Sequence, residues 1–384
     1  MNTLEEWEAL VKKQLKTDNI YEILQKENLE NIVVKPFYYN QSDYQHVPKI
    51  EESTHLVADY QKGLDEQAFA FLINENVDNL EEKAVFINNA DLAEHILTED
   101  SNRYFSLIDV FSDDQKALIN EHLAGELLSK NFDRNICIDV SFHQNSGASI
   151  IHQLSFALAK SKELVEKFGS GVLNQLIFRF AVGSQYFFEI AKIRAFKYLF
   201  NQFSKEFGKD LIPYIFVETS FRNKAKNDQE NNLIRSTLEL ASAMIGGADA
   251  VYSNNYKVEN PTELSKEISF KQQIVLAYES IINVFEDATA GSYFVEDITQ
   301  QLAEKSWKSF LDIEEKGGYL ELLKSGEIQK MIFEQAIKEQ SWVEEGKIKI
   351  VGVNLYPKLE VKKSVSDLYN SSEIKPVRLA EMFE

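Results

Sequence analysis

Two strand-like runs end next to polar residues that could carry chemistry. His143 comes shortly after the apolar run 136–141, whereas Glu218 ends the run 214–218 and Ser220 follows it. In α/β barrels the C-terminal ends of the strands carry the active-site groups. A glutamate at such a position either faces a ligand or binds a basic neighbour such as Arg222, and the sequence leaves both interpretations open.

General catalytic motifs are missing. There is no Walker phosphate loop, G-x-G-x-x-G, HExxH or G-x-S-x-G. The run N-E-H-L-A-G at 120–125 lies in a helical pattern, so His122 is interpreted as a surface histidine, and His152 as a packed or surface one. Cys137 lies in an apolar run and is predicted to be buried and inert, and no CxxC zinc site exists.

The elements that would position these residues alternate between strand-like and helix-like stretches. Apolar runs separated by amphipathic helices indicate parallel strands buried on both faces, and eight such runs predict an α/β fold of the (β/α)8 TIM-barrel type. An open doubly wound sheet is the alternative. The expected strands are 68–73, 84–87, 104–108, 136–141, 176–182, 214–218, 250–253 and 348–353, and the clearest helices are 148–168, 185–207 and 232–245.

Domain organisation follows from the same pattern. Residues 1–64 are predicted to form an extended and helical arm that contacts a partner, 65–356 the barrel, and 357–384 a C-terminal tail. In the arm, apolar residues at helical spacing from Leu4 to Leu15 form one face, which either the chain's own barrel or another subunit could cover.

Composition excludes several classes of protein. The 384 residues carry 61 acidic and 41 basic side chains, a net charge of -20. This balance argues against a nucleic-acid partner and against an anionic membrane surface. No basic stretch followed by an apolar one opens the chain, and no apolar run reaches the ~20 residues of a membrane helix. We therefore expect a cytoplasmic protein.

Several motifs in register resemble the barrel domain of the methylmalonyl-CoA mutase family. The resemblance is dense from about 136 to 356 and thin between 45 and 130. The motifs are Glu6-Trp7 and V-K-P-F-Y at 34–38, F-A-V-G at 180–183, E-I-A-K-I-R-A at 189–195, E-T-S at 218–220, Asp228, Asn231, Asn232, Arg235, the glycine pairs 246–247 and 317–318, and I-V-G-V-N at 350–354.

The resemblance implies a chemistry that this chain does not fully match. Family enzymes interconvert methylmalonyl-CoA and succinyl-CoA with adenosylcobalamin, and the CoA chain of the substrate threads the barrel. A C-terminal domain with a D-x-H-x-x-G motif holds the cobalamin, and some members pair the active chain with a homologous subunit that does no chemistry. Here no cobalamin domain is expected, and the T-I-R-Q-Y segment with the family's active-site tyrosine has no counterpart.

The family signature R-I-A-R-N-T-Q is altered. This chain reads E-I-S-F-K-Q-Q at 267–273, so Glu267 and Phe270 replace the two arginines, while Asp287, Gly291 and Ser292 are kept. Arginine is the natural clamp for carboxylate or phosphate, and glutamate repels both. The pattern indicates that the ligand groups are lost while the fold is retained.

His143 lies one position later than the family's active-site histidine when counted back from Gly147. A one-residue shift on a strand turns a side chain to the opposite face, although a local gap could restore it. No catalytic, metal-binding or cofactor-binding residue is therefore assigned. The expected remnants of a substrate pocket are His143, Glu218, Ser220, Phe270 and Gln272.

The leading hypothesis is the non-catalytic small subunit of a heterodimeric mutase, with adenosylcobalamin in the large partner and none in this chain. The alternative is a catalytic acyl-CoA mutase barrel whose cobalamin domain is a separate chain. A third possibility is a subunit that binds an acyl-CoA without reacting it. Phe or Tyr side chains filling the barrel axis would favour the first hypothesis, and an open channel that receives His143 the second.

Overall fold

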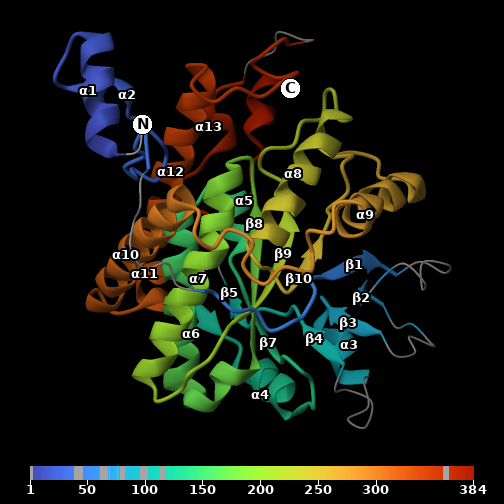
Figure 1. The fold of residues 1–384 in the computed structure, drawn as a ribbon. Helices are drawn as coiled ribbons and strands as arrows, with labels where there is room; N and C mark the ends of the chain where they lie inside the picture. The colour runs from blue at the N-terminus through green and yellow to red at the C-terminus, as the bar shows by residue number, and fades with distance from the viewer. Residues whose placement is uncertain are drawn as a thin grey trace.

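Eight parallel strands form a nearly closed barrel flanked by helices (Figure 1). The computed structural model describes residues 3–38, 46–60, 68, 70–75, 77, 83–95, 103–112, 117–357 and 363–384. The barrel strands are β1 His55–Asp59, β2 Ala70–Ile73, β3 Ala84–Ile87, β4 Tyr104–Ser106, β7 Ile136–Asp139, β8 Leu176–Val182, β9 Tyr214–Thr219 and β10 Ala250–Tyr252.

The strands follow one another around the barrel in chain order. β1 pairs with β2 on one side and with β10 on the other, where His55 lies opposite Ala250. Parallel bridges from Phe105 to Arg134 and from Asp109 to Cys137 join the β4 and β7 regions. The prediction of a (β/α)8 barrel is therefore confirmed. Between β4 and β7, a small hairpin pairs β5 Phe111–Ser112 with β6 Leu118–Ile119.

Helices surround the barrel, and the three that the sequence indicated most clearly are confirmed as α6, α7 and α8. Ser149 begins α6 by accepting a hydrogen bond from the backbone N–H of His152 (3.1 Å), a typical N-cap. The helices are α1 Leu4–Leu15, α2 Ile20–Leu24, α3 Ala90–His95, α4 Glu121–Ser129, α5 Ser141–Asn145, α6 Ile150–Phe168, α7 Tyr186–Glu206, α8 Asn231–Ile245, α9 Glu263–Tyr278, α10 Tyr293–Glu315, α11 Tyr319–Ser325, α12 Glu327–Glu344 and α13 Val365–Leu368.

One strand prediction was wrong. The run 348–353 is not a strand: Gly352 has a φ of 80°, and the side chain of Asn354 accepts the N–H of Ile350, so the segment turns. Its expected place is taken by β1, which lies in the stretch assigned to the arm and has only three buried residues, Leu56 to Ala58. The barrel therefore begins before residue 65.

The arm and the tail both reach the barrel. Leu29 and Ile32 are buried, and Val33 exchanges hydrogen bonds of 2.9 and 3.1 Å with Gln301 of α10. By contrast α1 has no buried residue. In the tail, the N–H groups of Val377 and Leu379 donate to the carbonyls of Asn145 (3.1 Å) and Arg222 (2.8 Å) at the C-terminal end of the barrel.

Hydrophobic packing forms two layers, one between the strands and the surrounding helices and one inside the barrel. The inner layer consists of Val57, Ala70, Leu72, Phe86, Phe105, Leu107, Cys137, Ile177, Tyr214, Phe216 and Ala250. Cys137 is buried as predicted, and burial raises the pKa of its thiol. None of the helices in the described part of the chain is long and apolar enough to cross a membrane.

Candidate functional site

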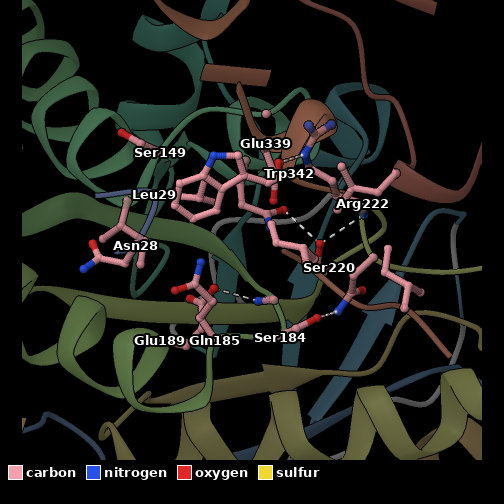
Figure 2. A pocket seen from close by; sticks show the side chains of 18 of the residues that line it. Asn28, Leu29, Ser149, Ser184, Gln185, Glu189, Ser220, Arg222, Glu339 and Trp342 are labelled. Carbon is pink, nitrogen blue, oxygen red and sulfur yellow. Dashed lines mark hydrogen bonds and ion pairs between the residues drawn. The ribbon is translucent and has the colours of Figure 1, made fainter. Parts of the chain in front are cut away.

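A cavity of about 620 Å³ opens at the C-terminal ends of β7, β8 and β9 (Figure 2). This is the end at which α/β barrels place their active sites. After β7, α5 contributes Gln144, and the loops after β8 and β9 contribute Ser184 and Ser220. The arm contributes residues 27–30, and α12 contributes Glu339 and Trp342. Five segments that are distant in sequence thus contribute to one site.

Polar groups around the cavity mostly bind one another. Arg222 binds Glu339 and donates to the carbonyl of Val377 (2.8 Å). Burial acts to lower the pKa of its guanidinium, but the charge of Glu339 acts in the opposite direction, and the pKa is raised above its ordinary value. Ser220 donates to Gln144 (3.1 Å). These are positioning contacts, and the described cavity-lining residues include no histidine that could act beside a carboxylate.

Gly147 marks the closest approach of two elements at this site. Its φ is 104°, and a Cβ atom built there would lie 2.5 Å from the Cβ of Ala336 on α12. Any other residue would be strained in its backbone and would push α12 away. The glycine therefore allows α12 to approach closely, and this places Glu339 and Trp342 over the mouth of the barrel.

Glu30 attaches the arm to the site. Its two carboxylate oxygens accept hydrogen bonds from the backbone N–H groups of Ile150 (2.9 Å) and Ile151 (3.2 Å), at the positive end of α6. Burial raises the pKa of Glu30 to about 7, and the nearby charge of Glu189 acts in the same direction. The two N–H donors and the charge of Lys192 oppose the increase.

Stability should therefore depend on pH through Glu30. An unfolded glutamate has a pKa of ~4.3, so Glu30 stays protonated to a higher pH in the folded state than in the unfolded state. This contribution to stability is fully present below about pH 4 and is lost as the pH rises through 7. Between about pH 5 and pH 8, the free energy of unfolding should fall by about 2–3 kcal/mol more for the wild type than for Glu30→Gln.

The measurement is urea denaturation across that pH range, with hydrogen exchange of residues 27–34 as a local readout. Glu27→Gln is the matched control, because Glu27 lies on the same segment but is exposed. It should keep the wild-type slope. Equal slopes for the wild type and Glu30→Gln would contradict the role given to this carboxyl group.

The barrel axis is filled by aromatic rings. The ring centroid of Phe86 lies 4.9 Å from that of Phe105 and 5.1 Å from that of Phe216, and Phe105 lies 4.9 Å from Tyr214. All four side chains are buried. A packed layer of this kind is a core and not a passage.

Above the aromatic layer, ion pairs close the axis towards the cavity. Arg179 donates to Glu218 through Nε (3.1 Å) and Nη2 (2.5 Å) and to Asn88 (3.2 Å), and Asp139 lies 3.5 Å away. Burial acts to lower the pKa of the Arg179 guanidinium, but the charges of Glu218 and Asp139 raise it above its ordinary value. Glu218 therefore binds a basic residue, as one of the two interpretations expected, but that residue is Arg179 and not Arg222.

His143 lies on α5 and points into the outer hydrophobic layer. Its Nε2 atom is 2.8 Å from the hydroxyl of Tyr319, and its ring centroid is 5.5 Å from that of Phe156. Both aromatic partners belong to the layer between strands and helices. The histidine is fully buried there and is not among the residues that line the cavity.

Phe270 and Gln272 lie on α9, away from the cavity. Phe270 is buried in the outer layer, and Gln272 donates to the carbonyl of Leu233 (2.5 Å) and to Thr237 (2.7 Å) of α8. Of the five predicted pocket residues, only Ser220 lines the cavity, and Glu218 faces the axis below it. The structure does not bring the five together.

Comparison with known proteins matches the barrel to one family. The family model described as methylmalonyl-CoA mutase matches residues 128–382. The chain belongs to the methylmalonyl-CoA mutase family. The mutase of Rhizobium meliloti (strain 1021) is 32% identical over 250 residues, which are 62% of this chain and 35% of that protein.

Two subunits of one bacterium are also similar. The methylmalonyl-CoA mutase small subunit of Porphyromonas gingivalis is 32% identical over 226 residues (56% of this chain, 37% of the relative), and its large subunit 29% over 245 residues (60% and 34%). The matched part of this chain spans about a third of the length of these mutase relatives.

The run 120–125, which imitates the histidine motif of the family's cobalamin domain, lies at the start of α4. It places His122 on this helix, where the side chain is 85% exposed and lies 3.5 Å from Glu126. This position is on the helix surface and not in the cavity. Within the described ranges, no group of three or more His, Cys, Asp or Glu residues could hold a metal ion.

Proposed function

We propose that this chain is the non-catalytic small subunit of a heterodimeric, adenosylcobalamin-dependent methylmalonyl-CoA mutase. In this proposal the large subunit carries out the isomerisation and holds the cobalamin, and this chain stabilises it. The observation that carries the proposal is the filled axis. A substrate whose CoA chain threads the barrel needs a passage, whereas Phe86, Phe105 and Phe216 pack in contact there.

Charge supports the same conclusion. An acyl-CoA is strongly anionic, and basic groups are needed to bind it. At the signature, Phe270 is buried and Glu267 pairs with Lys271 (2.6 Å), so neither serves as an anion clamp. Inside the barrel Arg179 is held by Glu218 and Asp139. His143, which faces the outer layer, offers no acid or base to the axis.

The tail adds a steric reason. Residues 377–380 bind the loops after β7 and β9 through Asn145 and Arg222, and Leu379 lines the cavity. They occupy part of the face that a cobalamin domain would have to approach. A domain that closes over an active site excludes water from it, and such a domain would need this face to be free.

One observation favours the alternative of a ligand-binding barrel. The cavity is large enough for a small polar molecule, and amide and hydroxyl groups line it. A chain that binds an acyl-CoA there without a passage through the axis would be a regulator of its partner. Direct titration of the purified chain with methylmalonyl-CoA and succinyl-CoA separates this case from the first.

The test is purification of this chain alone and together with the homologous large subunit from the same genome. We expect a one-to-one complex, and turnover of methylmalonyl-CoA only when the large subunit and adenosylcobalamin are present. The chain alone should show neither turnover nor cobalamin absorbance. Mutase activity of this chain supplied with a separate cobalamin domain would overturn the proposal.

A further inference from the structure

Two adjacent helices expose a stripe of large apolar side chains. α8 exposes Ile234 and Leu238, and α9 exposes Leu264, Val275 and Tyr278, each between 45% and 64% exposed. Positions 234 and 238 are one helical turn apart, and positions 264, 275 and 278 return to the same side of α9 at the helical period. These five residues are called the α8–α9 stripe below.

The stripe is one continuous surface. Gln272 of α9 binds the carbonyl of Leu233 and the hydroxyl of Thr237, which fixes the two helices side by side. At its upper end, Ile234 also lines the cavity, and Arg235 donates to the carbonyl of Val351 (2.8 Å) at the cavity rim. After α9 the exposed apolar series goes on with Ile281, Val284 and Phe285.

The opposite flank of the barrel is covered. There α10 packs along α6 and α7, and the arm in turn contacts α10 (Figure 1). Among the described large apolar residues, α6 exposes none, and α10 exposes Tyr293 and Leu311 near its two ends. Phe187 of α7 and four residues of the arm, Leu10, Leu15, Ile23 and Val33, are exposed as well. The α8–α9 stripe differs because its residues lie on two helices that pack side by side, and an exposed apolar patch of this kind is typical of a protein–protein contact.

Charge shows which kind of chain fits this surface. Along α9 the charges beside the stripe pair within the helix, Glu263 with Lys266 (2.9 Å) and Glu267 with Lys271 (2.6 Å). The stripe itself is therefore close to neutral and is suited to an apolar contact. The whole chain carries -20, so two copies repel each other, which favours a different chain as the occupant.

We propose that the α8–α9 stripe is the docking surface for a homologous barrel chain, the large mutase subunit. This inference rests on the proposed function. Large and small subunits of Porphyromonas gingivalis are 29% and 32% identical to this chain, so a homologous chain is the partner expected here. Homologous chains pair most simply around a pseudo-twofold axis, which brings equivalent faces together.

The experiment measures binding of the full chain to the large subunit by isothermal titration calorimetry. Leu238→Glu and Tyr278→Glu each place a charge within the stripe, and each should weaken the complex at least ~30-fold. Leu311→Glu on α10 is the matched control, since Leu311 is 45% exposed on the covered flank. It should change the dissociation constant by less than about twofold. Circular dichroism should show that all variants fold.

The outcomes separate the two proposals. If the complex forms and the stripe variants bind as the wild type does, the docking surface lies elsewhere while the proposed function stands. If the wild type does not bind the large subunit, both proposals fail. Light scattering of the chain alone should give a monomer, and a dimer that Leu238→Glu dissociates would identify a second copy as the occupant and overturn the inference.

Discussion

Replacing Arg194 by methionine is expected to lower the free energy of unfolding by about 3–5 kcal/mol, because it leaves two carboxylates without their cation. Arg194 of α7 is 1% exposed and binds both oxygens of Asp287 at 3.0 Å. It also donates to Glu296 (2.8 Å) and Thr299 (3.3 Å) of α10. Burial acts to lower its pKa, but these carboxylates raise it above the ordinary value.

Urea denaturation of the variant tests this expectation. Lys308→Met is the matched control: it removes an exposed cation from α10, the helix that holds Glu296 and Thr299, and should change stability by less than ~0.5 kcal/mol. Asp287→Asn in the Arg194→Met background should recover part of the loss, because it removes a buried unpaired charge. A loss below about 1 kcal/mol for Arg194→Met would show that the pair is not a major support of the fold.

The same contact explains why part of the family signature survives. Asp287, which follows the altered stretch 267–273 along the chain, is kept. Its carboxylate accepts hydrogen bonds from the guanidinium of Arg194 and from the backbone N–H of Val47. It joins the loop before α10 to α7 and to the segment before β1. The retained residue serves the fold, whereas Glu267 and Phe270, at the positions of the lost arginines, take part in no anion site.

How far the sequence predicted the fold depended on the length of the apolar runs. β8 and β9 are long, apolar on both faces and were placed within a residue of their observed ends. β1 was missed because His55 and Asp59 leave only three apolar residues between them. The run 348–353 has the apolar composition of a strand, but Gly352 and Asn354 form a turn closed by local hydrogen bonds, a signal that the apolar pattern hid.

The site was less predictable, because its walls come from distant segments. Ser220 could be placed at the mouth from its position after a strand. Glu30 lies 120 residues before the Ile150 N–H that it caps, and no local pattern joins them. Arg179 lies alone in an apolar strand, which signals a charge inside the barrel, yet its partner Glu218 follows only from the strand register.

Replacing Phe86 by alanine should also lower the free energy of unfolding by about 3–5 kcal/mol, since its ring fills the middle of the axis. It is fully buried, and its neighbours Phe105 and Phe216 lie in strands on different sides of the barrel, so they cannot collapse fully into the space. Phe285→Ala, at an apolar residue that is 50% exposed, should cost less than ~1 kcal/mol.

The Phe86→Ala variant also tests what closes the axis. The void it creates lies below Arg179 and Glu218, and these remain paired above it. We therefore expect no binding of methylmalonyl-CoA or succinyl-CoA by titration calorimetry at a temperature where the variant is folded. Binding gained by Phe86→Ala would mean that one ring alone keeps the substrate out. In that case the ion pairs between Arg179 and its partners would no longer count as a barrier, and the barrel would be one substitution from an acyl-CoA site.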